Sequence, residues 1–294
     1  MPVRISKPGK YSLVLDTPVM NAAGILGFGD QYRPLIDFAA LGAFVTNPIT
    51  YTPWNPASGT RVISLPSGAL VHTGLPNPGS SKVLTLYRTL WSRFPIPVIA
   101  HVVAHAPEEM SMCIAMLDRE ESIAALEIGL ADDLAPSEVE WYIHAAAKRT
   151  EKPLLARLHH GASHEHARAA LDAGADAIVA FAPPRGTARD PLARLTAGRL
   201  YGPMIKPLTL RIVGQIARKL PGVTLIAAGG IHSEADARDY LDAGATAVQV
   251  DAAVWSDPAL LARIGKDLAG LLLTRPVGID DELLEQFLSG KPAR

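Results

Sequence analysis

The sequence predicts a (β/α)₈ barrel, an α/β fold in which eight parallel strands alternate with eight helices. The most informative segment is an apolar run at 224–228 that ends in Gly229 and Gly230, before a short helical pattern and a second apolar run at 247–250. A similar unit occupies 166–180, where Asp-Ala-Gly-Ala again ends a helix before an apolar run. Repeated units of this kind build a parallel sheet, and 294 residues suit one such barrel.

Eight short apolar runs are the predicted barrel strands. Parallel strands that are buried on both faces consist almost entirely of apolar residues, and these runs have that composition. They are residues 19–23, 43–46, 98–103, 124–130, 154–158, 177–181, 224–228 and 247–250.

Eight segments with helical periodicity alternate with these runs. Ser137, Ser163 and Ser233 stand at or next to the start of three of them, where a serine side chain can accept a hydrogen bond from a free backbone N–H. The predicted helices are residues 32–40, 81–93, 108–120, 137–150, 164–173, 205–220, 235–243 and 259–272.

Two segments fall outside this alternation. Residues 4–15, which the tripeptide Pro-Gly-Lys interrupts, are predicted to form a hairpin that plugs the bottom of the barrel. Residues 51–79 are rich in Pro, Gly and Ser and are too long for a simple loop. We therefore expect them to carry strands, around 61–64 and 69–72, over the barrel mouth.

We expect a single domain over residues 1–294, because no composition shift marks a boundary. The tail has the pattern of a final amphipathic helix at 278–287, which could dock on a neighbour. The net charge of −1 gives no electrostatic footprint for nucleic acid or for an anionic membrane. A single cysteine excludes an internal disulfide, and no apolar run approaches the length of a membrane span. These features predict a soluble, cytoplasmic protein.

The glycine pair at Gly229 and Gly230 predicts an anion site. Glycine lets the backbone approach an anion closely, and free N–H groups at a strand end and a helix start point towards it. Barrels of this class commonly hold a phosphate at their last two strand ends. A phosphate-bearing cofactor is therefore the first hypothesis.

Six motifs stand in order along the chain. They are PVMNAAGILGFG at 18–29, LGAFVTNPIT at 41–50, GLPNPG at 74–79, YGPMIKP at 201–207, GGI at 229–231 and VQV at 248–250. Together they resemble the class 1 dihydroorotate dehydrogenases over roughly 18–264. The resemblance implies an FMN-binding barrel that oxidises dihydroorotate to orotate in pyrimidine biosynthesis, usually as a homodimer with its small-molecule ligand at the barrel mouth. Class 1B members pair with an iron–sulfur flavoprotein subunit, although no residue of this chain specifically supports that pairing.

The resemblance also implies a catalytic base, which in class 1 members is a cysteine on the loop after the fourth strand. That position is Asp132 here, and Cys113 cannot replace the cysteine because it falls inside a predicted outer helix. A carboxylate can act as a general base when its pKa is raised, so Asp132 is the candidate catalytic residue. The alternative is that Asp132 and Asp133 form a solvated turn.

Two further positions differ from the family pattern for the substrate. Asparagines that the resemblance implies fall on Val71 and Ala182. Unsatisfied polar atoms of a planar, anionic substrate would cost on the order of 1–3 kcal/mol each. We therefore expect no useful rate with dihydroorotate.

The cofactor contacts that the resemblance implies are partly retained. Asn47, His101 and Arg157 replace the family's lysine, asparagine and lysine, and Asp251-Ala252 replaces glycine followed by threonine or serine at the phosphate. A carboxylate near a phosphate is repulsive by about 1 kcal/mol even in water. The expected cofactor-binding residues are Ala22, Ala23, Gly24, Thr46, Asn47, His101, Arg157, Gly202, Gly229, Gly230, Asp251 and Ala252.

Two other patterns leave alternatives open. Four histidines at 159–166 suggest a metal-dependent enzyme that uses Asp132, His159 and Asp251. However, His164 and His166 lie two residues apart on the first turn of a predicted helix, so their side chains face different directions. We therefore assign no metal ligands. The Pro- and Arg-rich segment 183–194 is either an anion-binding loop or a mobile surface loop. The functional hypotheses are thus a flavin oxidoreductase with a changed substrate, a non-catalytic barrel that acts as a binding or assembly partner, and a metal-dependent enzyme.

Overall fold

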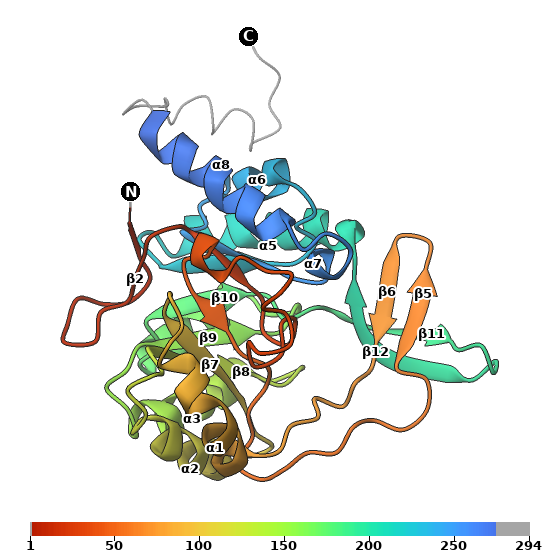
Figure 1. Ribbon diagram of the computed structural model, residues 1–294, viewed down its shortest axis with the longest axis horizontal. Coiled ribbons are helices and arrows are strands. Elements are labelled where there is room, and N and C mark those ends of the chain that lie inside the picture. Colours follow the sequence, from red (N-terminus) through yellow and green to blue (C-terminus); the bar gives the residue numbers. More distant parts are fainter. Residues whose placement is uncertain (1, 275–294) are drawn as a thin grey trace.

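The computed structural model describes residues 2–274, and these form a closed (β/α)₈ barrel (Figure 1). Each barrel strand lies within one of the predicted apolar runs. The strands are β3 (Val19–Asn21), β4 (Phe44–Val45), β7 (Val98–Val103), β8 (Ala125–Gly129), β9 (Leu154–Leu158), β10 (Ala177–Ala180), β13 (Leu225–Ala228) and β14 (Ala247–Val250). They pair in parallel in the order β3-β14-β13-β10-β9-β8-β7-β4, and a bridge between Met20 and Ala43 closes the ring.

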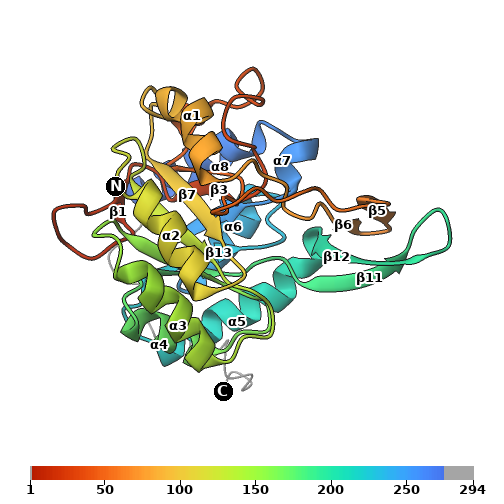
Figure 2. The same cartoon turned by 90° about the horizontal axis from the view of Figure 1, so that it is seen from below.

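Helices surround the strands (Figure 2). Seven of the eight predicted helices are present in the described part of the chain, and a short α7 follows β14. The helices are α1 (Ser80–Trp91), α2 (Pro107–Leu117), α3 (Pro136–Ala147), α4 (His164–Asp172), α5 (Lys206–Lys219), α6 (Glu234–Asp242), α7 (Ala253–Ser256) and α8 (Leu260–Thr274).

The helix expected at 32–40 is wrong. Turns occupy its first half, and only a 3₁₀-helix, η1 (Phe38–Ala40), forms at its end. Pro34 disfavours a helical conformation for the residue before it. The Asp37 carboxylate accepts a hydrogen bond from the N–H of Ala39 at 3.2 Å, which competes with a continuous helix.

Two of the three predicted serine caps are confirmed. Ser163 accepts a hydrogen bond from the N–H of Glu165, and Ser233 accepts one from that of Asp236. The expectation for Ser137 is wrong, because α3 begins one residue earlier at a proline that needs no N–H partner. The N–H of Ala135 there donates to the Glu138 carboxylate at 2.7 Å.

The N-terminal hairpin closes the bottom of the barrel, as expected. Its strands β1 (Val3–Arg4) and β2 (Val14–Leu15) pair antiparallel. Side chains from the hairpin complete an apolar layer inside the barrel, so this end is a packed core and not a channel. The buried residues of this layer include Ile5, Leu13, Leu15, Met20, Val45, Ile99, Leu155, Val179 and Ile226.

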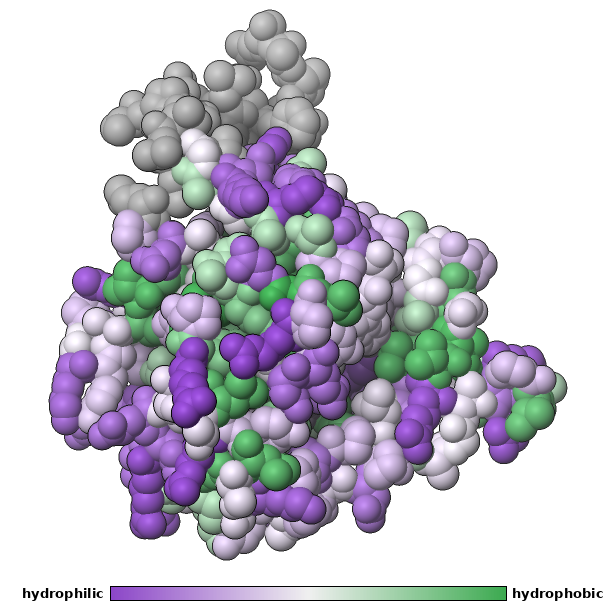
Figure 3. Space-filling view, in the orientation of Figure 1, coloured by the Kyte–Doolittle hydropathy of each residue, from purple (hydrophilic) through white to green (hydrophobic). Residues whose placement is uncertain are grey.

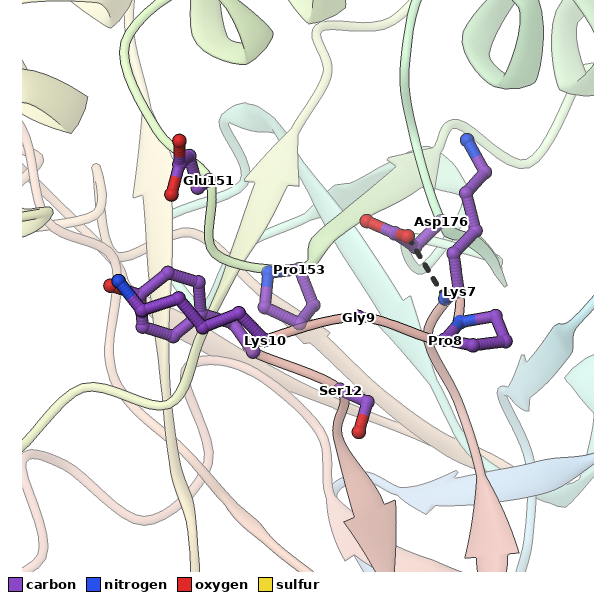
Figure 4. Close-up of a pocket in the computed structure, with 9 residues that line it drawn as sticks. Lys7, Pro8, Gly9, Lys10, Ser12, Glu151, Pro153 and Asp176 are labelled. Atoms are coloured by element: carbon purple, nitrogen blue, oxygen red, sulfur yellow. Dashed lines mark hydrogen bonds between the residues drawn. The ribbon is translucent and has the colours of Figure 1, made fainter.

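A small hollow of about 280 Å³ lies between the hairpin loop and the barrel (Figure 4). The N–H of Lys7 donates to the Asp176 carboxylate across it at 3.0 Å, and Glu151 and Pro153 stand just before β9. This is the end at which the barrel strands begin. Active sites of such barrels lie at the opposite end, so the hollow is not the candidate site.

A four-stranded antiparallel sheet projects beside the opposite end of the barrel (Figures 1 and 2). Its strands β5 (Val62–Leu65) and β6 (Gly68–Val71) confirm the strands expected in the insertion. The other two, β11 (Arg185–Arg189) and β12 (Leu195–Tyr201), complete the order β11-β12-β6-β5, which we call the mouth sheet. Apolar side chains gather on its surface over β5 and β6 (Figure 3), where Val62 is 59% exposed.

The interpretation of 183–194 as a loop is therefore wrong. Most of this segment is β11 and the tight turn that leads into β12. The Asp190 carboxylate organises the turn by accepting hydrogen bonds from the N–H groups of Leu192 and Arg194, both at 2.9 Å. β12 pairs with β11 on one side and, on the other, with β6, more than a hundred residues earlier in the chain. A local pattern cannot reveal such a pairing.

Within residues 2–274, no helix has the length and apolar character needed to cross a membrane. The helix expected at 278–287 lies outside the described residues. Cys113 lies inside α2 and is fully buried, as expected, and burial raises the pKa of its thiol to about 12.

Candidate functional site

A cavity of about 580 Å³ lies between the carboxyl ends of the barrel strands and the mouth sheet. Barrel strands, the loops that follow them and β12 all contribute to its wall. The residues that matter here are Ala23, Gly24, Asn47, Val71, His101, Asp132, Asp133, Arg157, Ala182, Arg185, Arg199, Tyr201 and Trp255.

The floor of the cavity is a polar layer directly above the apolar interior. Glu127 of β8 is fully buried at its centre, with Nδ1 of His101 2.9 Å from one carboxylate oxygen and the Arg157 guanidinium 3.3 Å from the same oxygen. Gln249 of β14 donates to the other oxygen at 2.6 Å and accepts from Arg157 at 2.5 Å. Arg157 also donates to the carbonyl of Phe181 at 3.2 Å. These contacts hold Arg157 and His101 in fixed positions under the cavity.

Burial by itself raises the pKa of Glu127. The positive charge of Arg157 and the hydrogen bonds from His101 and Gln249 outweigh burial and lower that pKa to about 2. Glu127 is therefore an anion in the folded protein at neutral pH. Sequence reasoning missed Glu127 and Gln249, although a polar residue in the middle of a buried apolar run was a usable signal.

Asp132 lies at the cavity wall on the turn after β8. One of its carboxylate oxygens is 2.6 Å from the Arg199 guanidinium of β12, and the other is 3.7 Å from that of Arg185 in β11. Arg199 also donates to the carbonyl of Pro183 at 2.9 Å. Asp132 thus links the barrel to the mouth sheet, and the turn expected at Asp132 and Asp133 is present.

The residues directly after β13 and β14 are not part of the cavity wall. Gly229, Gly230 and Asp251 are buried and do not line the cavity. The N–H of Gly230 donates to a carboxyl oxygen of Asp251 at 3.4 Å. The other carboxyl oxygen is buried with no hydrogen-bond partner among the described residues.

The sequence is similar to known proteins over most of its length. The family model described as dihydroorotate dehydrogenase matches residues 11–272. The chain belongs to the dihydroorotate dehydrogenase family. Two similar proteins carry the name dihydroorotate dehydrogenase B (NAD(+)), catalytic subunit. The one from Trichlorobacter lovleyi is 32% identical over 90% of this chain and 93% of its own, and the one from Desulforudis audaxviator is 31% identical over 92% and 94%.

Membership of the dihydroorotate dehydrogenase family confirms the resemblance seen in the motifs. The structure brings five of the expected cofactor positions together at the cavity, namely Ala23, Gly24, Asn47, His101 and Arg157. The carboxamide oxygen of Asn47 is buried and has no hydrogen-bond partner within residues 2–274. Asn47 and Arg157 both line the cavity, and the contacts of Arg157 with Glu127 and Gln249 fix its guanidinium.

Other expected cofactor positions support the wall without lining the cavity. Ala22 is buried behind it, and the Thr46 hydroxyl accepts the N–H of His101 and donates to the carbonyl of Asn47. Gly202 lies against the mouth sheet, where a Cβ atom would stand 2.2 Å from the carbonyl oxygen of Ser67. Ala252 lies at the start of α7. Their evident roles are in packing and backbone geometry.

Burial raises the pKa of the Asp251 carboxyl group, although His232, the N–H of Gly230 and Arg157 act in the opposite direction. Burial and the Asp251 charge raise the pKa of Tyr201 to about 12, and both also raise the pKa of Tyr240. A raised pKa means that ionised Asp251 costs stability in the fold. This cost is absent below about pH 4, where Asp is protonated in both the folded and unfolded states, and it grows as the pH rises.

We therefore expect Asp251→Asn to raise the melting temperature at pH 7.5, because the amide keeps the shape and removes the buried charge. The gain should shrink as the pH falls towards 4. Thermal unfolding of both proteins from pH 4 to 8 measures this difference. A melting temperature difference that stays constant with pH would contradict the assignment of the effect to Asp251 ionisation.

The histidines around the end of β9 do not form a ligand set. Burial lowers the pKa of His159 and His160, and the His159 ring packs edge-on against His166 at 5.3 Å between centroids. The Nδ1 atom of His166 accepts the N–H of Ser163, and its Nε2 lies 3.0 Å from the carbonyl of Leu134. Within residues 2–274, no three His, Cys, Asp or Glu side chains are grouped so that they could hold a metal. The described part of the chain gives the metal-dependent alternative no site.

Proposed function

We propose that this chain is a divergent dihydroorotate dehydrogenase-family barrel that binds a small molecule in the mouth cavity and does not oxidise dihydroorotate at a useful rate. The observation that carries the proposal is the ion pair of Asp132 with Arg199 at 2.6 Å. Asp132 stands where the resemblance implies the catalytic base. A general base needs a lone pair that is free to accept the substrate proton.

The ion pairs hold Asp132 away from that role. Arg199 engages one oxygen and Arg185 lies 3.7 Å from the other, so guanidinium groups stand at both oxygens that a substrate would have to approach. Charge-assisted hydrogen bonds of this kind are among the stronger ones in proteins. The same contacts join the barrel to the mouth sheet, which gives Asp132 a structural function.

The walls of the cavity also suit dihydroorotate poorly. Val71 and Ala182, where the resemblance implies asparagines, both line it. Each polar ring atom that faces an apolar side chain loses a hydrogen bond at a cost on the order of 1–3 kcal/mol. By contrast, the Arg157 guanidinium, which Glu127 and Gln249 hold in place at the cavity, favours a ligand that carries a hydrogen-bond acceptor. Binding is therefore retained, with a changed ligand.

The names of similar proteins support a proposal about assembly. The names of two similar proteins describe a catalytic subunit, which implies an assembly for those proteins. We propose that this chain, too, is a cytoplasmic homodimer that can pair with an iron–sulfur flavoprotein subunit. Co-purification of the chain with such a subunit, followed by size-exclusion chromatography with light scattering, tests this proposal.

We expect the purified chain, supplied with FMN and a dye as electron acceptor, to form no orotate above the blank. Formation of orotate is followed by its ultraviolet absorbance, and the Trichlorobacter lovleyi relative serves as a positive control under the same conditions. The Asp132→Asn variant should behave like the unmodified protein, because Asp132 does not act as a base that takes a proton from the substrate. Orotate formation that this variant abolishes would overturn the proposal and identify Asp132 as the base.

A further inference from the structure

The last two strand ends of the barrel form a cradle for a small group. Gly229 and Gly230 have φ angles of +133° and +67°, which favour glycine. A Cβ atom on Gly230 would stand 2.5 Å from the backbone nitrogen of Lys206, so no side chain fits there. The N–H of Gly230 donates to Asp251, the residue directly after β14, at 3.4 Å. Barrels of this class commonly hold a phosphate at such a place.

In this chain the Asp251 side chain occupies that cradle. Asp251 is 3% exposed, and it accepts the N–H of Gly230 that a phosphate would need. The other carboxyl oxygen and Nε2 of His232 are both buried without hydrogen-bond partners in the described part of the chain. A phosphate here would compete with the Asp251 side chain for the N–H of Gly230, and the ionised carboxylate would also repel it.

Gly229, Gly230 and Asp251 do not line the mouth cavity, whereas Tyr201 and Trp255 do. The ring centroids of Tyr201 and Trp255 are 5.8 Å apart. The indole N–H of Trp255 donates to the carbonyl of Ile25 at 3.0 Å, which fixes the ring. Gly24, Asn47 and Arg157 line the cavity of about 580 Å³, and the residues of the glycine cradle do not.

We infer that the Asp251 carboxyl group is a built-in replacement for a ligand phosphate, and that the cavity selects planar heterocycles that lack a phosphate group. The inference rests on the proposed function in taking the mouth cavity as the ligand site. It also means that the residues present do not fit the phosphate of FMN. A dephosphorylated flavin such as riboflavin carries the same ring system without the group that Asp251 excludes.

The test is a comparison of riboflavin and FMN binding at pH 7.5, measured by flavin fluorescence and equilibrium dialysis. The unmodified protein should bind riboflavin at least about tenfold more tightly than FMN, which corresponds to about 1.4 kcal/mol. Asp251→Gly empties the cradle and should raise the affinity for FMN about tenfold or more, with little change for riboflavin. Inorganic phosphate should then weaken FMN binding to this variant.

Asp133→Gly is the matched control, because Asp133 lines the cavity away from the cradle and the same type of change should leave the flavin preference unaltered. Circular dichroism shows whether the variants fold, and Asp251→Ser replaces Asp251→Gly if the glycine variant does not fold.

Uptake of FMN by the emptied cradle supports the inference even if the unmodified protein binds neither flavin. Equal or tighter binding of FMN by the unmodified protein, or no gain of FMN affinity in either Asp251 variant, would overturn it. Oxidation of dihydroorotate would overturn the proposed function alone, since it leaves the ratio of the two flavin affinities unchanged.

Discussion

Replacing Glu127 by alanine is expected to lower the free energy of unfolding by about 3–5 kcal/mol. The side chain is fully buried and faces Arg157, His101 and Gln249. Its removal leaves the Arg157 guanidinium in the barrel interior without its counter-ion, which is the costly way to break a buried ion pair. Urea denaturation followed by circular dichroism measures the change. The matched control is Glu140→Ala, because Glu140 is exposed on α3.

The same residue predicts a pH dependence. The pKa of Glu127 is lowered to about 2 in the fold, so its stabilising contribution is fully present above the ordinary pKa of about 4.3 and is lost as the pH falls towards 2. The difference in stability between the unmodified protein and Glu127→Gln should therefore be largest at neutral pH and should narrow below about pH 5. A difference that widens in acid would show that Glu127 is not held as an anion.

Replacing Gly202 by alanine is expected to destabilise the protein and to open the pairing of β6 with β12 inside the mouth sheet. Gly202 has a φ of +144°, and strain at such a backbone conformation costs about 1–3 kcal/mol for other residues. In addition, the new Cβ would lie 2.2 Å from the carbonyl oxygen of Ser67, beside the turn between β5 and β6. Because that oxygen belongs to the backbone, the turn itself must move. The pairing of Tyr201 with Ala69 would open first.

Denaturation and limited proteolysis together measure this effect, with cleavage expected in residues 60–75 of the variant. Gly222→Ala is the control, because Gly222 also has a positive φ of +80° but has nothing within 4 Å of the added Cβ. Its loss of stability reports the backbone strain alone. Equal losses in the two variants, without new cleavage in the mouth sheet, would contradict a steric role for Gly202.

Much of the barrel was predictable because its signals are local. Each barrel strand is buried on both faces, so its sequence is a short apolar run, and the helix ends carry glycine and serine at positions set by backbone geometry. The same locality explains the failure at 32–40. There Pro34 and the Asp37 side chain decide against a helix that the apolar spacing alone suggested.

The candidate site was predicted in its position but not in its contacts. The family resemblance led to Asn47, His101, Asp132 and Arg157, and these do meet at one cavity. It did not reveal that Arg199 from β12 would pair with Asp132, because this pair joins residues 67 positions apart in the chain. Nor did it place Glu127, whose partners come from three different strands.

The sequence by itself determined the fold, the ancestry and the positions of the candidate site, since these depend on apolar periodicity and on short motifs. Only the tertiary structure decided which groups each polar side chain meets. It showed that Asp132 is held by arginines of the mouth sheet and that Asp251 turns inwards to the N–H of Gly230. The physical reason is that hydrogen bonds and ion pairs depend on distances of a few ångströms between residues far apart in the chain, which closure of the barrel alone brings together.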